Sequence, residues 1–304
     1  MQYQKENFLT LKYPKLNILV AFPYFKQSIF NYLQSKDPNS FRLIIDSGAF
    51  TAWNTGKFIS LDKYCEFLKN IPKEWEYKVV QLDVYGNPKE TYINYMKMLD
   101  MGMKDIMPVF TRGDTEERLN EFYNYTDYIM FGGIAIGGEN TNYVKWFCET
   151  NKDRKAHWLG FVNVPFMKKY KPYSVDSSSM FSTMRWGQLQ VYMGNGRLKS
   201  VHKRKFNKKP NDELIQCMVK AGCDIKEISL LSKLESWDGG KKNLPWRKGG
   251  LKGLASFITV KSHVKRGVDL ERNVGTKIYF AASGVNQLED IFDAYKILQE
   301  RKCI

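Results

Sequence analysis

The feature that most constrains the fold is a regular alternation of short apolar segments with segments of helical spacing. Eight of the apolar segments have the length and the β-branched and aromatic residues of buried strands. This alternation is typical of an α/β protein with a parallel sheet, and eight strands favour a closed (β/α)8 TIM-like barrel over a doubly wound sheet. The predicted strands are Leu16–Phe22, Leu43–Asp46, Tyr77–Leu82, Ile106–Phe110, Tyr128–Phe131, His157–Phe161, Tyr173–Val175 and Lys277–Ala282.

Helical spacing of apolar residues follows most of these strands. Pro88 suits the first turn of a helix, because its missing N–H would have no partner there. The predicted helices are Phe25–Gln34, Leu61–Leu68, Pro88–Asp100, Glu116–Tyr123, Asn142–Thr150 and Gln287–Glu300.

About a hundred residues separate the last two predicted strands, which is too long for a simple crossover. We therefore predict that residues 1–176 carry strands one to seven with the mouth of the barrel, that residues 177–275 form an insertion, and that residues 276–304 complete the barrel. Gly194-Asn195-Gly196 predicts a hairpin turn between two strand-like arms. A pair of helices is predicted at Asp212–Ala221 and Ile225–Leu234.

Positive charge is concentrated in this insertion. The chain has a formal net charge of +15, and between Lys171 and Gly275 there are 21 Lys and Arg against 9 Asp and Glu. Such asymmetry indicates a polyanionic partner, most simply nucleic acid, although a lysine-rich protein could also carry a solvated basic face. Trp237 and Trp246 lie among these basic residues and could stack on bases or belong to the core. The predicted nucleic-acid-binding residues are Arg197, Lys199, Lys203, Arg204, Lys205, Lys208 and Lys209.

Composition and motifs exclude several other classes. Five scattered cysteines argue against a disulfide framework and fit a reducing compartment. No apolar run approaches the roughly 18 residues that span a bilayer, and the first residues contain no apolar signal core. We therefore expect a cytoplasmic protein without membrane contact. No cofactor is expected, because the chain has no dinucleotide fingerprint and no phosphate loop, and its three histidines lack metal-type spacing.

The carboxyl ends of barrel strands converge on one mouth, which brings distant residues together. Three carboxylates, an aromatic ring and exposed glycine amides suit a purine: carboxylates accept from its N–H groups, amides donate to its carbonyl, and the ring stacks. The two outer carboxylates could then divide the nucleophile and acid/base roles of glycosyl transfer. The alternative for Asp46 is that it only caps a helix or fixes a turn. The predicted mouth contains Asp46, Phe50, Asp83, Gly132, Gly133, Leu159, Gly160 and Asp176.

Four motifs at these positions resemble the tRNA-guanine transglycosylase superfamily, most closely its phage and bacterial DNA-modifying branch, the DpdA-type DNA-guanine transglycosylases. They occur in the order and approximate spacing of that family, and the match spans roughly Leu43 to Ser179. The motifs are Asp46-Ser47-Gly48-Ala49-Phe50, Phe131-Gly132-Gly133-Ile134-Ala135-Ile136-Gly137, His157-Trp158-Leu159-Gly160 and Ser174-Val175-Asp176-Ser177-Ser178-Ser179.

The resemblance implies that guanine in a polynucleotide is exchanged for a free 7-deazaguanine base through a covalent glycosyl-aspartate intermediate. It places Asp176 as the nucleophile and Asp46 as the general acid/base. It implies further that Phe50 stacks on the purine and that Asp83 reads its edge. The remaining implied substrate-binding positions are Gly132 and Gly133, whose amides face the purine carbonyl, and Leu159, where the family usually has a methionine, with Gly160 beside it.

Two departures from tRNA-acting relatives favour DNA as the target. Cys217 and Cys223 lack the third cysteine of the family's zinc site, and an appended tRNA-binding domain has no room here. We therefore expect no zinc. Three alternatives stay open: a tRNA-guanine transglycosylase without zinc, a catalytically silent barrel that binds nucleic acid, and an unrelated small-molecule barrel enzyme. Relatives often dimerise, so the resemblance also implies a homodimer.

Overall fold

The protein is a mixed α/β fold built on one parallel sheet. The computed structural model describes residues 13–134, 141–151, 153–182, 186–206, 211–237 and 250–304. Nine strands of the described residues form the sheet, in the order β4-β3-β2-β1-β11-β8-β7-β6-β5, and every pair in it is parallel. The strands are β1 Leu16–Ala21, β2 Phe41–Asp46, β3 Tyr77–Val80, β4 Ile106–Met107, β5 Val109–Phe110, β6 Tyr128–Phe131, β7 Lys155–Trp158, β8 Ser174–Ser177 and β11 Lys277–Ala282.

The two ends of this strand order almost meet. β4 pairs with β3 and β5 pairs with β6, yet only Pro108 separates β4 from β5 in the chain. The buried side chain of Gln81 spans this seam, because its Oε1 accepts from the Val109 amide at 3.0 Å and its Nε2 donates to the Thr91 carbonyl at 2.8 Å. The sheet is therefore nearly closed and compatible with a TIM-like barrel.

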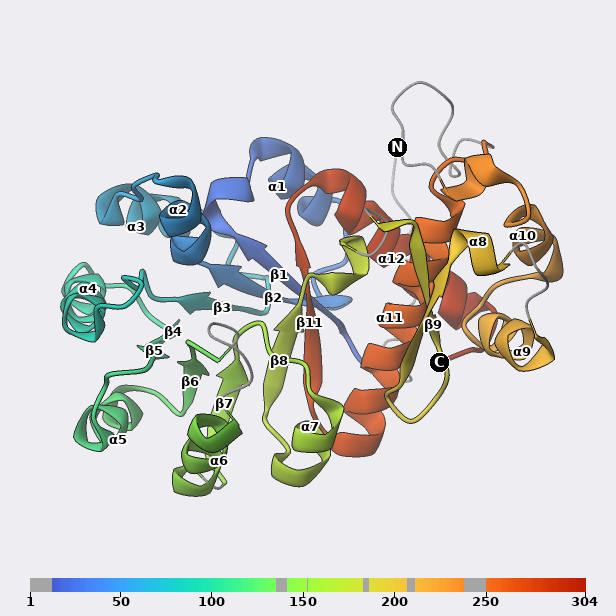
Figure 1. Ribbon diagram of the computed structural model, residues 1–304. Helices are drawn as coiled ribbons and strands as arrows, with labels where there is room; N and C mark the ends of the chain where they lie inside the picture. The colour runs from blue at the N-terminus through green and yellow to red at the C-terminus, as the bar shows by residue number, and fades with distance from the viewer. Residues whose placement is uncertain (1–12, 135–140, 152, 183–185, 207–210, 238–249) are drawn as a thin grey trace.

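Helices surround the outside of the sheet (Figure 1). Several begin at a side chain that accepts from a backbone amide of the first turn, as at Asn87, Thr115 and Asn163, which supplies the partner that this amide would otherwise lack. The helices outside the segment between β8 and β11 are α1 Gln27–Gln34, α2 Ala49–Thr55, α3 Leu61–Lys69, α4 Pro88–Asp100, α5 Glu116–Tyr125, α6 Thr141–Thr150, α7 Val164–Tyr170 and α12 Val285–Glu300, with the 3-10 turn η1 Phe22–Tyr24.

A separate apolar cluster fills the interior of the sheet. Its residues come from seven strands: Leu19, Ile44, Val80, Met107, Val109, Tyr128, Met130 and Tyr279. Side chains of a strand alternate between its two faces, so residues two positions further along also point inward. Those next positions include Ala21 and Ala281, which are small, and the carboxylate Asp46. The apolar filling thus gives way to small and acidic residues toward the carboxyl ends of the strands.

The segment between β8 and β11 has a hydrophobic core of its own. Leu189, Met218 and Trp237 belong to this core, and the indole N–H of Trp237 donates to the Leu231 carbonyl at 2.8 Å. Trp237 is therefore a core residue and not a surface stacking residue. The segment contains η2 Ser179–Phe181, the antiparallel hairpin β9 Gln188–Tyr192 and β10 Leu198–His202, α8 Lys203–Phe206, α9 Asp212–Lys220, α10 Ile225–Leu230, η4 Leu234–Trp237 and α11 Leu254–Val274.

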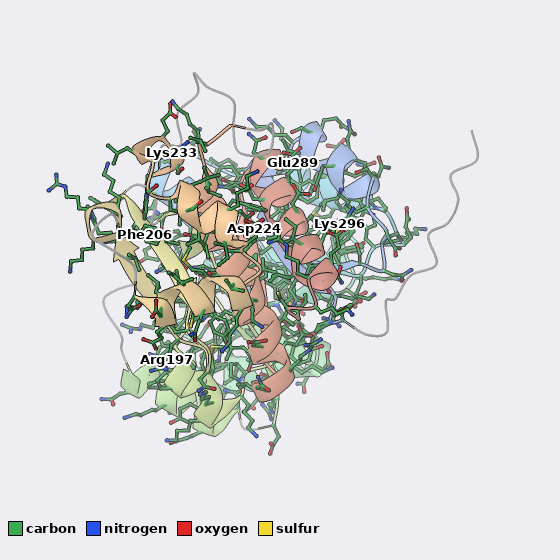
Figure 2. All side chains as sticks on the ribbon, turned by 90° about the vertical axis from the view of Figure 1, so that its right-hand side faces the viewer. Arg197, Phe206, Asp224, Lys233, Glu289 and Lys296 are labelled. Carbon is green, nitrogen blue, oxygen red and sulfur yellow. The ribbon has the colours of Figure 1, made fainter. Side chains whose placement is uncertain are left out.

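Helix α11 connects the two parts of the molecule. Leu254 and Ile258 near its start pack in the core of the segment, whereas Val264 and Val268 pack in the core outside the sheet. Figure 1 shows α11 between the sheet and the group formed by α8, α9, α10 and the hairpin, and Figure 2 looks onto that group.

Most predicted elements are present, and the differences have local causes. Pro108 splits the fourth predicted strand, because proline cannot donate to a ladder. The sixth begins at Lys155 and ends at Trp158, two residues before the predicted start and three before the predicted end, so Leu159 and Gly160 follow it. The seventh extends to Ser177, so Asp176 lies inside the strand. Helices α2, α7, α8 and α11 were not predicted. Lys208, Lys209 and Trp246 lie outside the described residues.

None of the helices in the described part of the chain combines the length and the apolar character needed to cross a membrane.

Candidate functional site: an acidic mouth

Three carboxylates meet at the carboxyl ends of β2, β3 and β8, which are brought together by the curvature of the sheet. Asp46 ends β2, Asp83 follows β3, and Asp176 lies in β8. The pKa of Asp46 is raised to about 7, mainly by burial, and the charges of Asp83 and Asp176 raise it further while the Gly48 amide opposes the shift. Because both other carboxylates act on Asp46, the three share one electrostatic environment. The structure thus brings together the three acidic residues that the sequence placed at the mouth.

The turn after Asp46 is held by the same carboxylate. Its Oδ2 accepts from the Gly48 amide at 2.9 Å. Gly48 has a φ of 80°, and a Cβ at this position would lie 2.4 Å from Cδ of Pro23, so only glycine fits. Asp46 therefore fixes a turn, as the alternative interpretation of the sequence proposed, and also contributes a carboxyl group with a raised pKa to the mouth.

Asp83 is connected to this turn through a buried hydroxyl. The Ser47 Oγ donates to Asp83 Oδ1 at 3.1 Å. Burial raises the pKa of Asp83, and the hydrogen bond from Ser47 opposes that shift. Asp46 and Asp83 are both partly exposed, so they remain open to a ligand.

Asp176 is surrounded by hydrogen-bond donors. Its Oδ1 accepts from the Gly160 amide at 2.6 Å and lies 3.1 Å from Nε2 of His157. The His157 ring is fully buried, and its Nδ1 lies 2.5 Å from the Ser174 hydroxyl. Gly160 is a predicted substrate-binding residue, and in the structure its amide donates to Asp176. His157 was not among the predicted site residues, although it begins one of the four motifs and lies on a predicted strand.

Gly132 and Gly133 differ in their surroundings. The Gly132 amide donates to the Phe110 carbonyl at 2.8 Å and so continues the sheet. Gly133 has a φ of 71° and is partly exposed. A Cβ on Gly132 would lie 3.7 Å from Cδ1 of Leu159, so these two predicted residues are neighbours at the mouth.

Phe50 belongs to an exposed aromatic cluster on the rim. Its ring is 52% exposed and lies near Trp53 of the same helix, which is 54% exposed, and near Tyr85, which follows Asp83 by two residues. The centroids of Trp53 and Tyr85 are 4.0 Å apart. Three aromatic rings beside two carboxylates form a surface on which planar bases can stack. Trp53 and Tyr85 were not predicted, although both follow a predicted site residue within three positions.

The predicted basic residues are distributed along the whole hairpin. Arg197, Lys199, Arg204 and Lys205 are exposed, and Lys203 is half-buried. Figure 2 shows Arg197 at the turn of the hairpin, well separated from Phe206 of α8, which follows the second strand of the hairpin.

The end that carries Arg197 packs against the last turns of α11. Arg266 Nε donates to the Gly196 carbonyl at 2.8 Å, which fixes the hairpin turn against the last turns of α11. Glu271, in the final turn of that helix, bonds Arg42 and Asn17 near the amino ends of β2 and β1. The turn therefore lies toward the amino ends of the strands, opposite the carboxylates.

The other end of the hairpin leads back to the mouth. The Lys203 amide donates to the Gly187 carbonyl at 3.0 Å, and Gly187 follows β8 by ten residues. Lys203, Arg204 and Lys205 are thus the basic residues on the mouth side of the hairpin.

No group of three or more His, Cys, Asp and Glu side chains in the described ranges is arranged to hold a metal ion. Cys217 lies in α9, and the buried Cys223 follows that helix.

The fold and the site define a barrel-like α/β protein with an acidic, aromatic-rimmed mouth. Comparisons of the chain with protein-family models, with curated proteins and with solved structures found no match.

Proposed function

We propose that the protein is a transglycosylase that exchanges guanine in DNA for a free 7-deazaguanine base, as its resemblance to the DNA-guanine transglycosylases implies. In this proposal the sheet is a (β/α)8 barrel in which β4 and β5 are one strand interrupted by Pro108, and residues 177–275 are a basic insertion before the last strand. A DNA substrate would place the enzyme in the cytoplasm, or in the host cytoplasm if a phage encodes it.

The observation that carries the proposal is the pairing of two carboxylates with different surroundings in one mouth. Asp46 has a pKa near 7, so it can both give and take a proton at neutral pH. Asp176 is held through one oxygen by a backbone amide and an imidazole, which suits a fixed nucleophile. Pairs of acidic groups with divergent environments mark acid/base and nucleophile roles in glycosyl transfer.

The reaction is a double displacement. Asp176 attacks the anomeric carbon of the target nucleotide, the bond to guanine breaks, and Asp46 donates a proton to the departing base. The incoming deazapurine then loses its ring proton to Asp46 and attacks the same carbon, which releases the Asp176 carboxylate. Asp46 returns to its protonated form, so one proton is carried through each cycle and no cofactor is needed.

Recognition of the base falls to the rest of the mouth. Asp83 can accept from the ring N–H and amine of guanine, the Gly133 amide can donate to its carbonyl, and Phe50 and Leu159 provide apolar contacts. A duplex hides both sugar and base, so the target must be single-stranded or flipped out, at a cost of a few kcal/mol. Stacking on the aromatic rim and phosphate contacts from Lys203, Arg204 and Lys205 would help to offset that cost.

The proposal is tested by incubating the protein with guanine-containing single-stranded DNA, duplex DNA and tRNA, each with cyano-, aminomethyl- and amidino-substituted 7-deazaguanines. Nucleosides from each polymer are then analysed by mass spectrometry. We expect the deazaguanine nucleoside in DNA only. Incorporation only into tRNA would instead identify a zinc-free tRNA enzyme, and no incorporation into either polymer would overturn the proposed reaction.

The variant Asp176→Asn separates an enzyme from a silent binding protein. We expect this variant to bind DNA with unchanged affinity while losing turnover and the covalent protein–DNA species that denaturing gels detect in the wild type. Asp153→Asn, an exposed substitution outside the mouth, serves as the matched control and should behave like the wild type. A wild-type protein that binds DNA but forms no covalent species under any condition would favour the binding function.

A further inference from the structure

A chain of buried hydrogen bonds runs across three neighbouring strands to Asp176. Tyr128 of β6 bonds the Ser174 hydroxyl of β8, and Ser174 Oγ lies 2.5 Å from Nδ1 of His157 on β7. His157 Nε2 in turn lies 3.1 Å from Asp176 Oδ1. His157 and Ser174 are fully buried, and Tyr128 is nearly so. The chain therefore lies in the interior of the sheet, shielded from solvent, and reaches the mouth only at its last member.

The donor and acceptor capacities of these groups give the chain a direction. An ionised carboxylate can only accept, so His157 Nε2 carries the proton toward Asp176. Nδ1 of a neutral imidazole then accepts, which requires the Ser174 hydroxyl to donate to it. Ser174 Oγ is left to accept from the Tyr128 hydroxyl. Every polar group in the chain is satisfied in this arrangement, as buried polar groups require.

The doubly protonated imidazole does not fit the same contacts. Its Nδ1–H would donate to Ser174, and the Ser174 proton would have to turn toward Tyr128. The Tyr128 hydroxyl would then have no acceptor among the contacts of the described residues. The geometry thus selects the neutral Nε2–H tautomer of His157.

The two oxygens of Asp176 are distinguished by this chain. Oδ1 accepts from both Gly160 and His157. Oδ2 takes part in no hydrogen bond with the described residues, so it retains its lone pairs for a ligand or an electrophile. The Gly160 amide comes from the loop after β7, and the His157 ring comes from β7. Together these two donors hold Oδ1 and restrain rotation of the carboxylate.

We infer that His157, fixed in one tautomer by Ser174 and Tyr128, is a positioning residue that locks Asp176 so that Oδ2 is the oxygen that attacks the sugar. This inference rests on the proposed function of Asp176 as a nucleophile. The simpler role for such a chain is to stabilise the barrel by satisfying buried polar groups. The two roles differ in what removal of His157 changes, since loss of positioning affects the chemical step and loss of stability affects folding.

The first test compares His157→Phe, His157→Gln and Ser174→Ala with the wild type in single-turnover formation of the covalent DNA species. We expect His157→Phe to slow that step about 100-fold, as misplacement of a reacting group by about 1 Å does, with KM for DNA nearly unchanged. His157→Gln keeps an amide donor and should recover at least part of the rate. The inference is overturned if the His157→Phe variant has the wild-type melting temperature and also reacts at the wild-type rate. That result would leave the proposed function intact.

The second test does not depend on activity. The chain has three histidines, so the imidazole nitrogens of 15N-labelled protein can be assigned by comparison with the His157 variants. We expect the shifts of His157 to report Nε2–H with an unprotonated Nδ1, and Ser174→Ala to weaken that preference. An Nδ1–H tautomer or an imidazolium in the wild type at pH 7.5 would refute the chain. Wild-type protein that has the expected tautomer but exchanges no base would refute the proposed function, and with it the attack by Oδ2, while leaving the hydrogen-bonded chain in place.

Discussion

At the scale of single residues, Asp46 has the property that most affects the chemistry. A carboxyl group with a pKa of about 7 is a proton donor and a proton acceptor in the same pH range. The raised pKa also has a cost in stability. Because the folded protein holds the proton up to about pH 7 and the unfolded chain releases it near pH 4, the stability associated with this group is present below the unfolded pKa and is lost as the pH rises toward 7.

We therefore predict that Asp46→Asn stabilises the protein at pH 8 and has little effect at pH 4, where the native carboxyl group is protonated. Asn keeps an oxygen for the Gly48 amide but carries no charge. The gain in the free energy of unfolding is at most about 1.4 kcal/mol for each pH unit between the folded and the unfolded pKa. Thermal unfolding of both proteins across this pH range measures it. If the variant gains no stability over the wild type between pH 4 and pH 8, the pKa of Asp46 is not raised in the folded protein.

The sequence predicted the meeting of Asp46, Asp83 and Asp176 because each lies in or follows an apolar strand and parallel strands end at one edge. It could not predict that His157 joins them. A histidine on a buried strand contacts whatever the neighbouring strands present, and that depends on the register of β7 against β8, which pairs His157 with Ser174. Nor could spacing predict that the Gly160 amide faces a carboxylate, because β7 ends earlier than its apolar pattern.

At the scale of elements, α11 is the long helix that the sequence pattern does not reveal. Most of its residues are buried, so the polar and apolar faces that reveal a helix are not distinct. It also contains β-branched residues and Gly267, which are weak helix formers. Gly267 is explained by packing, because a Cβ there would lie 2.7 Å from Cζ of Phe280 on β11. Tertiary contacts, and not local preference, hold this helix.

The basic hairpin allows a prediction in which one element provides its own control. Arg204 and Lys205 lie on the mouth side, whereas Arg197 and Lys199 lie toward the turn. We expect Arg204→Ala with Lys205→Ala to weaken binding to single-stranded DNA. The slope of log affinity against log salt concentration should become shallower by about 0.7 for each phosphate that no longer has a basic partner. Fluorescence anisotropy over a salt series measures both quantities.

The matched double variant, Arg197→Ala with Lys199→Ala, removes the same charge from the other end of the hairpin. It should change affinity and salt dependence much less. Equal losses of affinity from both double variants would mean that affinity reflects total charge and not position. A larger loss from the variant at the turn would mean that DNA binds near the amino ends of the strands and not at the mouth.

At the scale of the whole molecule, a buried ion pair joins α10 to α11, the helix that packs in both hydrophobic cores. Lys261 of α11 is fully buried, and its Nζ donates to Glu227 of α10 at 2.8 Å and to the Gly222 carbonyl at 3.1 Å. Arg301, after the last helix, also donates to Gly222. Since α11 packs in both hydrophobic cores, we expect the two parts to unfold together.

We predict that Lys261→Met destabilises the entire chain by about 3 kcal/mol, because it leaves the buried Glu227 carboxylate with Arg301, at 3.5 Å, as its remaining cationic partner. Denaturant unfolding followed by tryptophan fluorescence and by circular dichroism should give one shared transition at a lower midpoint. Lys296→Met, which removes an exposed lysine 3.9 Å from Glu300, should have almost no effect. Two separate transitions would contradict the coupling.

The closure of the sheet combines backbone bonds with one side chain at the break between β4 and β5. The Gln81 amide donates to the Met107 carbonyl at 3.1 Å, and the Met130 amide donates to the Pro108 carbonyl at 2.8 Å. Where Pro108 cannot donate, Gln81 reaches across from the end of β3 to the Val109 amide. Gln81 and Pro108, which are distant in the sequence, therefore act together where the sheet closes. In diverged copies of this chain, we expect glutamine at 81 to persist where proline is kept at 108, and both to be replaced together where an ordinary strand takes over.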